Sequence, residues 1–447
     1  MDNISLSRQN LNDIIMKSNN SMNVTAAEQA SDLLFASLFM DMDVVKQTTR
    51  TLKDRPERTK QILEVLSSMM KERMPKFKHD LGKDEVSQQQ ALKDLAMTRV
   101  DEWVSAIGNP SMRQYAALSK HWNIPVGDII KGITPKKIYE LLDWFVVGQE
   151  DYKRKIATSF YVYRMKCDPS KESMSLPRNN LLVYGPSGSG KTYCIQVLAR
   201  QFGSVSICID CSTLVPQGIV GTNVSDYFTR AYMNLEGLNE REKEEKIKNA
   251  LVLFDEFDKT PKESIINEFL SLIDDKGRIS FRESFNSNSD YITIPTNKMM
   301  FVFTGVFDGL DAIRSGNSIG FQGQEAVAKK AISSSDLIRY GIKPEIVGRI
   351  HSCTTVEQLA VNDLYELLSA KMESPLNDYL NYFYLNDIKI TVTDEAKMML
   401  AQKAYNMGLG VRGLKNMIST ILEKEMFELH PDQSLTVDEE YIERHIQ

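Results

Sequence analysis

The chain has few cysteines and few histidines, and their spacing suits neither a metal site nor redox chemistry. There are five of each among 447 residues. Cys208 and Cys211 form one CxxC, and no second CxxC completes a four-ligand zinc site. No histidine lies in an HExxH motif. Residues 206–210 alternate like a strand, so we interpret both cysteines as reduced core thiols.

Long apolar runs are also lacking. No window approaches the roughly 18 apolar residues that a membrane-spanning helix needs. The chain begins MDNISLSRQN, with an early acidic residue and without the apolar stretch of a signal peptide. We therefore expect no membrane partner and a cytoplasmic location. The net charge of −6 disfavours nucleic acid as a general partner.

Apolar residues make up 42% of the chain, enough for the cores of two or three domains. Helical apolar spacing at 26–42 and 59–70 predicts a helical N-terminal adaptor or recruitment domain over 1–130. Beyond residue 133, short apolar runs alternate with amphipathic helices, which predicts an α/β fold with a parallel sheet over 131–352. A small, mostly helical domain is expected over 353–447.

The individual elements expected in the last two domains follow from the same patterns. Nearly continuous apolar runs predict buried strands at 181–184, 205–209, 251–254 and 299–303. Helical spacing after residue 349 predicts helices at 361–372, 394–405 and 411–427.

A phosphate-binding motif follows the first predicted strand. GxxxxGK[ST] is matched at every fixed position by the segment Gly185, Pro186, Ser187, Gly188, Ser189, Gly190, Lys191 and Thr192. A helix is expected next, at 193–201. A strand, a loop and a helix in this order are the structural context that the motif requires. The alternative is a chance Gly/Ser loop. Backbone N–H groups of such a loop surround phosphates. Lys191 is then expected to reach the β- and γ-phosphates of ATP, and Thr192 to ligate Mg²⁺.

Two adjacent carboxylates follow the third predicted strand. Asp255 and Glu256 come at the carboxyl end of a buried run, the edge of a parallel sheet where ligands bind. We expect Asp255 to hold Mg²⁺ and Glu256 to orient and deprotonate the attacking water. A surface turn is the alternative. Together with the phosphate loop, the two acids predict an ATPase.

The surrounding sequence resembles the ClpX group of AAA+ ATPases from about residue 133 to the C-terminus. Residues 255–259, Asp-Glu-Phe-Asp-Lys, are similar to its DExDK motif, and residues 134–138 and 146–150 to the first segment of its large domain. The resemblance implies an AAA+ P-loop NTPase large domain with a small helical lid domain. It also implies that Val146 and Val147 line the adenine pocket.

The sensor-1, arginine-finger and sensor-2 motifs of this family are matched, in that order, by residues 301–307, 336–349 and 408–414. Thr304 takes the sensor-1 position, Arg349 that of the arginine finger and Arg412 that of sensor 2. Singly, each has a structural alternative: a backbone-satisfying threonine or a surface arginine. As an ordered set they imply that Arg412 acts from the lid of its own subunit and Arg349 from a neighbour. The implied assembly is a homo-oligomeric, hexameric ring.

The resemblance extends in part to the contacts with protein substrates. The axial pore loop of the family reads Gly-Tyr-Val-Gly, whereas this chain has the apolar but non-aromatic sequence Gly218, Ile219, Val220 and Gly221. Little room for a second pore loop remains between Lys259 and the helix expected at Ile265. The N-terminal zinc domain of the family is missing, because no cysteine precedes Cys167.

A tripeptide between the sensor-1 and arginine-finger motifs bears on the partner. Ile319, Gly320 and Phe321 match the element that docks ClpX on the ClpP peptidase; a local turn is the alternative.

We predict a ring-forming ATPase that unfolds or remodels proteins held in its pore. The alternative is an ATP-switched scaffold or loader that acts on a partner complex or nucleic acid without threading. The tripeptide favours the first function, and the missing pore aromatic favours the second.

Overall fold

The computed structural model describes residues 112, 115, 125–130, 132–172, 174–177, 179–216, 221–260, 263–286, 288–315, 332–369, 373–431 and 433–446. The chain divides into two units, Met1–Lys131 and Gly132–Gln447. One short helix of the first unit, α7 (Val126–Ile129), is described. The helices predicted at 26–42 and 59–70 lie outside the described residues.

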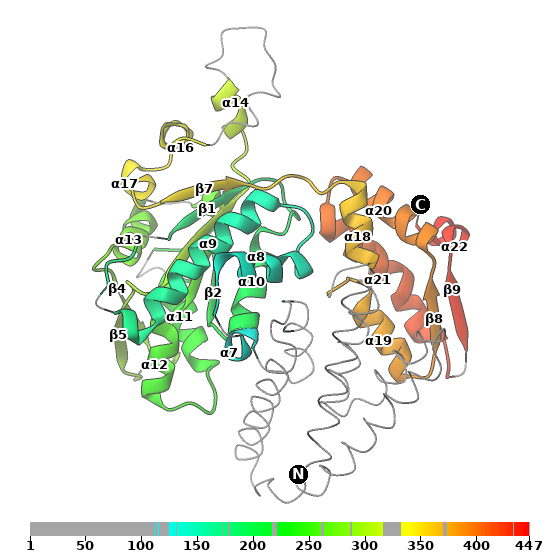
Figure 1. The fold of residues 1–447 in the computed structure, drawn as a ribbon, viewed down its shortest axis with the longest axis horizontal. Helices are drawn as coiled ribbons and strands as arrows, with labels where there is room; N and C mark the ends of the chain where they lie inside the picture. The colour runs from blue at the N-terminus through cyan, green and yellow to red at the C-terminus, as the bar shows by residue number, and fades with distance from the viewer. Residues whose placement is uncertain are drawn as a thin grey trace, which may run out of the picture. The chain divides into compact units, whose positions relative to one another are not determined.

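A five-stranded parallel sheet lies in the first part of the second unit, and α18–α22 with β8 and β9 lie beside that part (Figure 1). Its spatial order is β2-β3-β6-β1-β7. The strands are β1 (Leu181–Tyr184), β2 (Ser206–Asp210), β3 (Leu251–Asp255), β6 (Met300–Gly305) and β7 (Ser352–Thr355). The three inner strands are the continuously apolar runs, as burial on both faces requires. The predicted parallel α/β sheet is confirmed, and β6 separates the phosphate-loop strand from the strand of the two acids.

The two edge strands differ from the sequence-based expectation. β7 was not predicted, because its sequence Ser-Cys-Thr-Thr lacks the apolar run of a buried strand, and it pairs only with β1 among the described strands. β2 alternates between buried and exposed side chains. Cys208 points to the exposed face, so interpreting it as a core thiol is wrong, whereas Cys211 is buried. An edge strand with one face covered explains the difference.

Helices flank the sheet and connect its strands. Several begin at a side-chain cap that satisfies backbone N–H groups, such as Thr134 before α8 and the capping box of Asn223 before α11. The helices are α8 (Pro135–Phe145), α9 (Glu150–Cys167), α10 (Lys191–Phe202), α11 (Val224–Met233), α12 (Glu240–Lys248), α13 (Glu263–Ile273), α14 (Leu310–Ser315), α16 (Ser334–Tyr340) and α17 (Pro344–Val347). Two 3₁₀ turns, η1 (Pro169–Lys171) and η2 (Phe257–Lys259), and a hairpin of β4 (Arg278–Arg282) and β5 (Tyr291–Pro295) complete this part.

The C-terminal part has a hydrophobic core of its own. It comprises α18 (Val361–Ser369), α19 (Asn377–Leu385), α20 (Asp394–Asn406), α21 (Gly410–Glu428) and α22 (Glu439–His445), with a small parallel sheet of β8 (Lys389–Val392) and β9 (Ser434–Val437). The helices predicted at 394–405 and 411–427 are confirmed to within one residue at either end. The helix predicted at 361–372 is described as far as Ser369. We call this part the lid.

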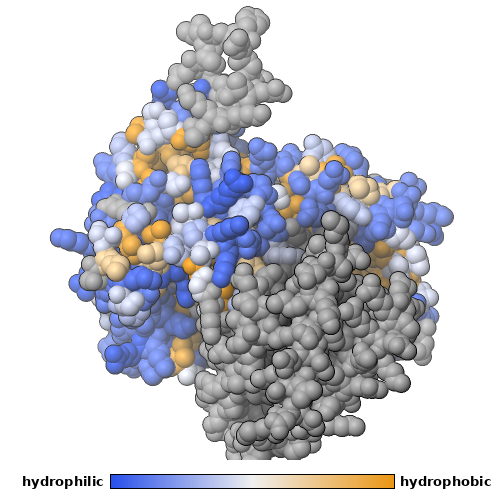
Figure 2. All heavy atoms as spheres, in the orientation of Figure 1, coloured by the Kyte–Doolittle hydropathy of each residue, from blue (hydrophilic) through white to orange (hydrophobic). Residues whose placement is uncertain are grey.

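On the face shown in Figure 2, hydrophilic side chains predominate and apolar ones form small separate patches. None of the helices within the described ranges is both long and apolar enough to cross a membrane.

Candidate nucleotide-binding site

The phosphate loop leaves β1 at Gly185 and enters α10 at Lys191, as the motif predicts. Gly185 and Gly188 have φ values of 146° and 74°, which L side chains rarely adopt. A Cβ on Gly185 would lie 2.2 Å from the backbone oxygen of Val356, and one on Gly188 would lie 2.6 Å from that of Leu409. The absence of a side chain at both glycines therefore allows the backbone of Val356 and of Leu409 to approach the phosphate loop closely.

Lys191 is held by the loop itself. Its Nζ donates to the carbonyl oxygens of Gly185 and Pro186, each at 2.7 Å, and the residue is only 8% exposed. Burial lowers the pKa of Lys191 to about 8, although nearby Asp255 and Asp258 oppose the shift. A buried ammonium whose described hydrogen bonds go only to two backbone carbonyl oxygens is a site where a phosphate would be stabilised.

Asp255 connects three elements at the carboxyl edge of the sheet. Its Oδ2 accepts a hydrogen bond from Thr192 Oγ1 at 3.0 Å, and its Oδ1 accepts one from Thr304 Oγ1 at 2.6 Å. These bonds arise because β6 lies between β1 and β3 in the sheet. A hydroxyl and a carboxylate this close are suitable Mg²⁺ ligands, since Mg²⁺ usually takes one or two protein oxygens together with phosphate and water.

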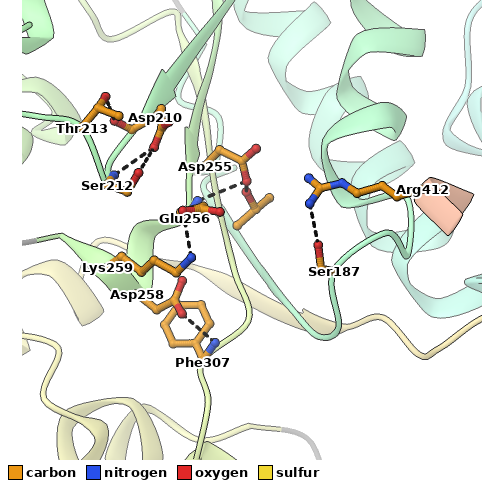
Figure 3. A network of polar contacts seen from close by, with 11 residues as sticks. Ser187, Asp210, Ser212, Thr213, Asp255, Glu256, Asp258, Lys259, Phe307 and Arg412 are labelled. Atoms are coloured by element: carbon orange, nitrogen blue, oxygen red, sulfur yellow. Dashed lines mark hydrogen bonds and ion pairs between the residues drawn. The ribbon is translucent and has the colours of Figure 1, made fainter. Parts of the chain in front are cut away.

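Glu256 follows β3 in a left-handed conformation, with φ of 51°, which is uncommon for a residue other than glycine. Its carboxylate accepts from Lys259 Nζ at 3.0 Å, and its backbone N–H donates to Asp255 Oδ1 at 3.1 Å (Figure 3). Asp258 Oδ2 accepts from the backbone N–H of Phe307 at 3.0 Å, just after β6. Asp258 and Lys259 belong to the DExDK-like motif but were given no role from the sequence; Asp258 holds the backbone after β6, and Lys259 holds the Glu256 carboxylate.

A cavity of about 300 Å³ opens beside the phosphate loop. Val146 and Val147, predicted to line an adenine pocket, line it and are each 4% exposed. Thr304 is fully buried and does not line the cavity; it reaches the site through Asp255. Eleven further lining residues were not assigned to the site from the sequence: Phe145, Tyr193, Gln196, Gly305, Val306, Leu359, Leu367, Glu373, Pro375, Val411 and Lys415.

Gln149 fixes the segment that follows the two valines. Its side-chain Nε2 donates to the carbonyl oxygen of Glu357 at 2.7 Å, and the Glu357 N–H donates back to Gln149 Oε1 at 3.0 Å. Glu357 lies in the connection between β7 and α18, so this amide pair ties the wall of the cavity to the start of the lid.

The structure brings one of the two predicted arginines to the cavity. Arg412, near the start of α21, lines it and donates from Nη1 to Ser187 Oγ at 3.0 Å (Figure 3). Arg349 does not line it; its Nη2 donates to Asp274 Oδ2 at 2.7 Å, just beyond α13, and its Nη1 to the carbonyl oxygen of Glu345. Arg412 therefore lies at the cavity of its own chain, whereas Arg349 lies outside it.

The predicted contacts with protein partners fall largely outside the described residues. These are Gly218, Ile219 and Val220 of the pore loop, and Ile319, Gly320 and Phe321. Gly221 is described, and the nearby Val215 N–H donates to the carbonyl oxygen of Thr222 at 3.0 Å. η2 ends at Lys259 and α13 begins at Glu263, and the expected lack of room for a second pore loop between them stays a prediction.

Sequence comparisons agree with this architecture. Residues 176–353 match the family model of the AAA domain (Cdc48 subfamily), and residues 373–442 match that of the C-terminal, D2-small domain of ClpB protein. The chain is an AAA+ ATPase that is similar to the Clp/Hsp100 group. The two matches fall on the sheet-containing part and on the lid, which together enclose the cavity.

Named relatives of this AAA+ ATPase include two ClpX proteins. The ATP-dependent Clp protease ATP-binding subunit ClpX 2 of Wolinella succinogenes is 28% identical over 328 residues, which cover 68% of this chain and 79% of the relative. The subunit ClpX of Treponema denticola is 26% identical over 66% of this chain and 77% of its own length. Both alignments span about two thirds of this chain.

Replacing the buried lysine is expected to separate stability from binding. Below pH 8 the folded ATPase carries the full cost of the buried Lys191 charge; this cost diminishes between pH 8 and 10.5, where the unfolded chain binds more protons. Lys191→Met should therefore raise the free energy of unfolding of the nucleotide-free protein at pH 7 by about 1–3 kcal/mol. It should also weaken ATP binding strongly.

Thermal melting at pH 7 and pH 10, with and without ADP, measures both effects. The advantage of the Met variant should shrink at pH 10, and ADP should stabilise only the wild type. A Met variant that ADP stabilises as much as the wild type would contradict the role of Lys191.

Proposed function

We propose that this AAA+ ATPase forms a ring whose ATP hydrolysis unfolds or remodels protein substrates. The observation that carries the proposal is the position of Arg349. The cavity holds the phosphate loop, two carboxylates and Arg412, yet Arg349 is bound to Asp274 outside it. Phosphoryl transfer is accelerated strongly by an additional arginine at the γ-phosphate. A neighbouring subunit can supply that arginine only if subunits assemble side by side, in a hexamer by family resemblance.

Within one subunit, each residue of the site has a proposed task. Lys191 and the N–H groups of the phosphate loop bind the β- and γ-phosphates, and Val146 and Val147 contact the adenine. Thr192 and Asp255 hold Mg²⁺, which neutralises phosphate charge when bound. Glu256 orients and deprotonates water, while Thr304 positions Asp255. The short contacts of Asp255 and the buried state of Lys191 support these assignments.

By resemblance, we assign residues 131–352 to the large ATPase domain and 353–447 to the lid. For residues 1–130, the helical apolar spacing of the sequence is the basis on which we propose a recruitment domain. The relatives are named as ATP-binding subunits of a Clp protease. For this chain we propose that Ile319, Gly320 and Phe321 dock a ClpP-type peptidase. The scaffold or loader function remains the second candidate, favoured by Ile219 in place of the pore aromatic.

Substitutions at Ile219 test whether substrate passes through the pore. A pore side chain grips by apolar contact, and burying some tens of Å² contributes near 1 kcal/mol per loop at about 25 cal/mol per Å². Ile219→Tyr, which adds a flat ring, should speed the unfolding of a stable test protein. Ile219→Ser should abolish the stimulation of ATPase by unfolded protein while basal ATPase persists. If the Ser variant remodels its substrates as well as wild type does, the scaffold function replaces threading.

Phe321→Ala tests the peptidase contact separately. The loss of an apolar anchor from an interface should weaken binding to the ClpP-type peptidase of the same cell by at least about tenfold. ATPase activity should be unaffected, and Ile219→Ser serves as the reciprocal control, since it should leave peptidase binding intact. Sedimentation or interferometry with purified peptidase measures the contact. If wild-type protein shows no affinity for the peptidase, the ring works without it.

A further inference from the structure

Glu373 connects the lid to the helix that carries the phosphate-binding lysine. Its Oε2 accepts a hydrogen bond from Tyr193 Oη at 2.7 Å and another from Arg200 Nη2 at 2.8 Å. Tyr193 and Arg200 both belong to α10, which begins at Lys191. Tyr193 and Glu373 also line the nucleotide cavity. One carboxylate therefore joins two points of α10 at the wall of the cavity.

The spacing of the two donors explains why one oxygen can serve both. Tyr193 and Arg200 are seven residues apart, about two helical turns, so their side chains leave the same face of α10. The extended Arg200 side chain reaches back along the helix to the same carboxylate as Tyr193. Burial, followed by the bond to Glu373, raises the pKa of Tyr193, so its hydroxyl remains a donor at physiological pH.

The backbone that presents Glu373 is anchored in the lid. The next residue, Ser374, donates from Oγ to the carbonyl oxygen of Leu368 at 3.2 Å and accepts from the N–H of Leu376 at 3.3 Å. Leu368 and Leu376 are buried in the lid core. Movement of the lid away from α10 would therefore break both bonds of Glu373 together.

Glu373 and Arg412 hold the lid to α10 and the phosphate loop in different ways. Arg412 bonds Ser187 of the phosphate loop and is a charge for the nucleotide phosphates. Glu373 is an anion whose partners are both protein groups, so it is a positioning residue and not a catalytic one. We infer that Glu373 keeps the lid closed over bound nucleotide by bridging Tyr193 and Arg200, and thereby sets how long nucleotide stays bound. The inference rests on the nucleotide site proposed above.

Glu373→Gln tests the bridge by removing its charge at constant shape. Side chains of Glu373 and Arg200 are 35% and 53% exposed, so a moderate effect is expected. The dissociation rate of a fluorescent ADP should rise about three- to tenfold, the scale of one or two net hydrogen bonds. KM for ATP should rise similarly, and kcat should change much less. Stopped-flow displacement and steady-state kinetics measure the three quantities.

The matched control is Glu428→Gln, another charged lid glutamate, which lies 3.9 Å from Lys424 with both side chains 56% exposed. It does not line the cavity and should leave the ADP dissociation rate unchanged. The double variant Tyr193→Phe with Arg200→Met breaks the same bridge without changing a lid residue. It replaces Glu373→Gln in the test if Glu373→Gln lowers the melting temperature. Adding Glu373→Gln to this double variant should not change the ADP dissociation rate further, because the three groups act as one unit.

Two results would overturn the bridge. One is an ADP dissociation rate in Glu373→Gln equal to that of Glu428→Gln. The other is an additive effect of the large-domain and lid substitutions. Lys191→Ala separates this failure from a wrong nucleotide site: if it abolishes ADP binding while Glu373→Gln has no effect, only the bridge is wrong. If Lys191→Ala binds ADP normally, the site itself is wrong.

Discussion

Arg349→Ala is expected to reduce ATP turnover by roughly a thousandfold, the scale of a lost arginine finger. Each subunit should still bind ATP, because Arg349 does not line the cavity of its own chain. Steady-state ATPase and equilibrium ATP binding measure the two properties. Mixing Arg349→Ala with Lys191→Ala subunits should partly restore hydrolysis, since some interfaces then combine an intact phosphate loop with an intact finger.

Asp274→Asn is the matched control for this prediction. It breaks the ion pair with Arg349, which measures 2.7 Å, but leaves the arginine in the chain. If Arg349 acts only by pairing with Asp274, both variants should lose activity alike. An arginine finger instead requires the Asn variant to retain most of the turnover. Failure of mixed rings that demonstrably assemble to regain activity would count against action between subunits.

Glu256→Gln is expected to bind ATP with near-normal affinity and hydrolyse it at least about a hundredfold more slowly, the usual effect of losing a positioned base. The substitution preserves shape, and the Glu256 backbone bond to Asp255 does not depend on the side chain. Single-turnover hydrolysis separates the chemical step from binding.

Lys259→Met provides the accompanying control. It removes the partner that bonds the Glu256 carboxylate at 3.0 Å while the base itself remains. Since both side chains of that pair are about half exposed, at 52% and 42%, its loss should affect turnover far less than the loss of the base. Wild-type turnover in Glu256→Gln would show that another group activates the water.

The parts of the site that the sequence predicted are those encoded by contiguous residues. Asp255 and Glu256 follow an apolar run, and the phosphate loop follows another, so strand, loop and chemistry coincide in one window. The hydrogen bond between Thr304 and Asp255 could not be predicted from one window of sequence, because it depends on β6 lying beside β3 in the sheet. Residue order along the chain does not fix that neighbour relation; family resemblance supplied the position of Thr304 but not its partner.

The missed features depend on contacts between distant segments or on weak local signals. Glu373 meets Tyr193 across 180 residues of chain, and no pattern around Glu373 marks it. The edge strand β7 is polar because only part of its surface is covered, so apolar periodicity could not reveal it. The prediction that Cys208 is a core thiol was wrong for a related reason: the alternating pattern of a strand does not indicate whether both faces of that strand are packed.

The claim that ATP drives a protein chain through the pore is tested most directly by photo-crosslinking from position 219. A photoreactive residue replaces Ile219 in the Glu256→Gln protein, which is loaded with ATP and an unfolded test protein. We predict crosslinks to many positions along the test protein, dependent on ATP and lost on adding Lys191→Ala. A ring that retains the test protein but gives no crosslink from position 219 would contradict threading.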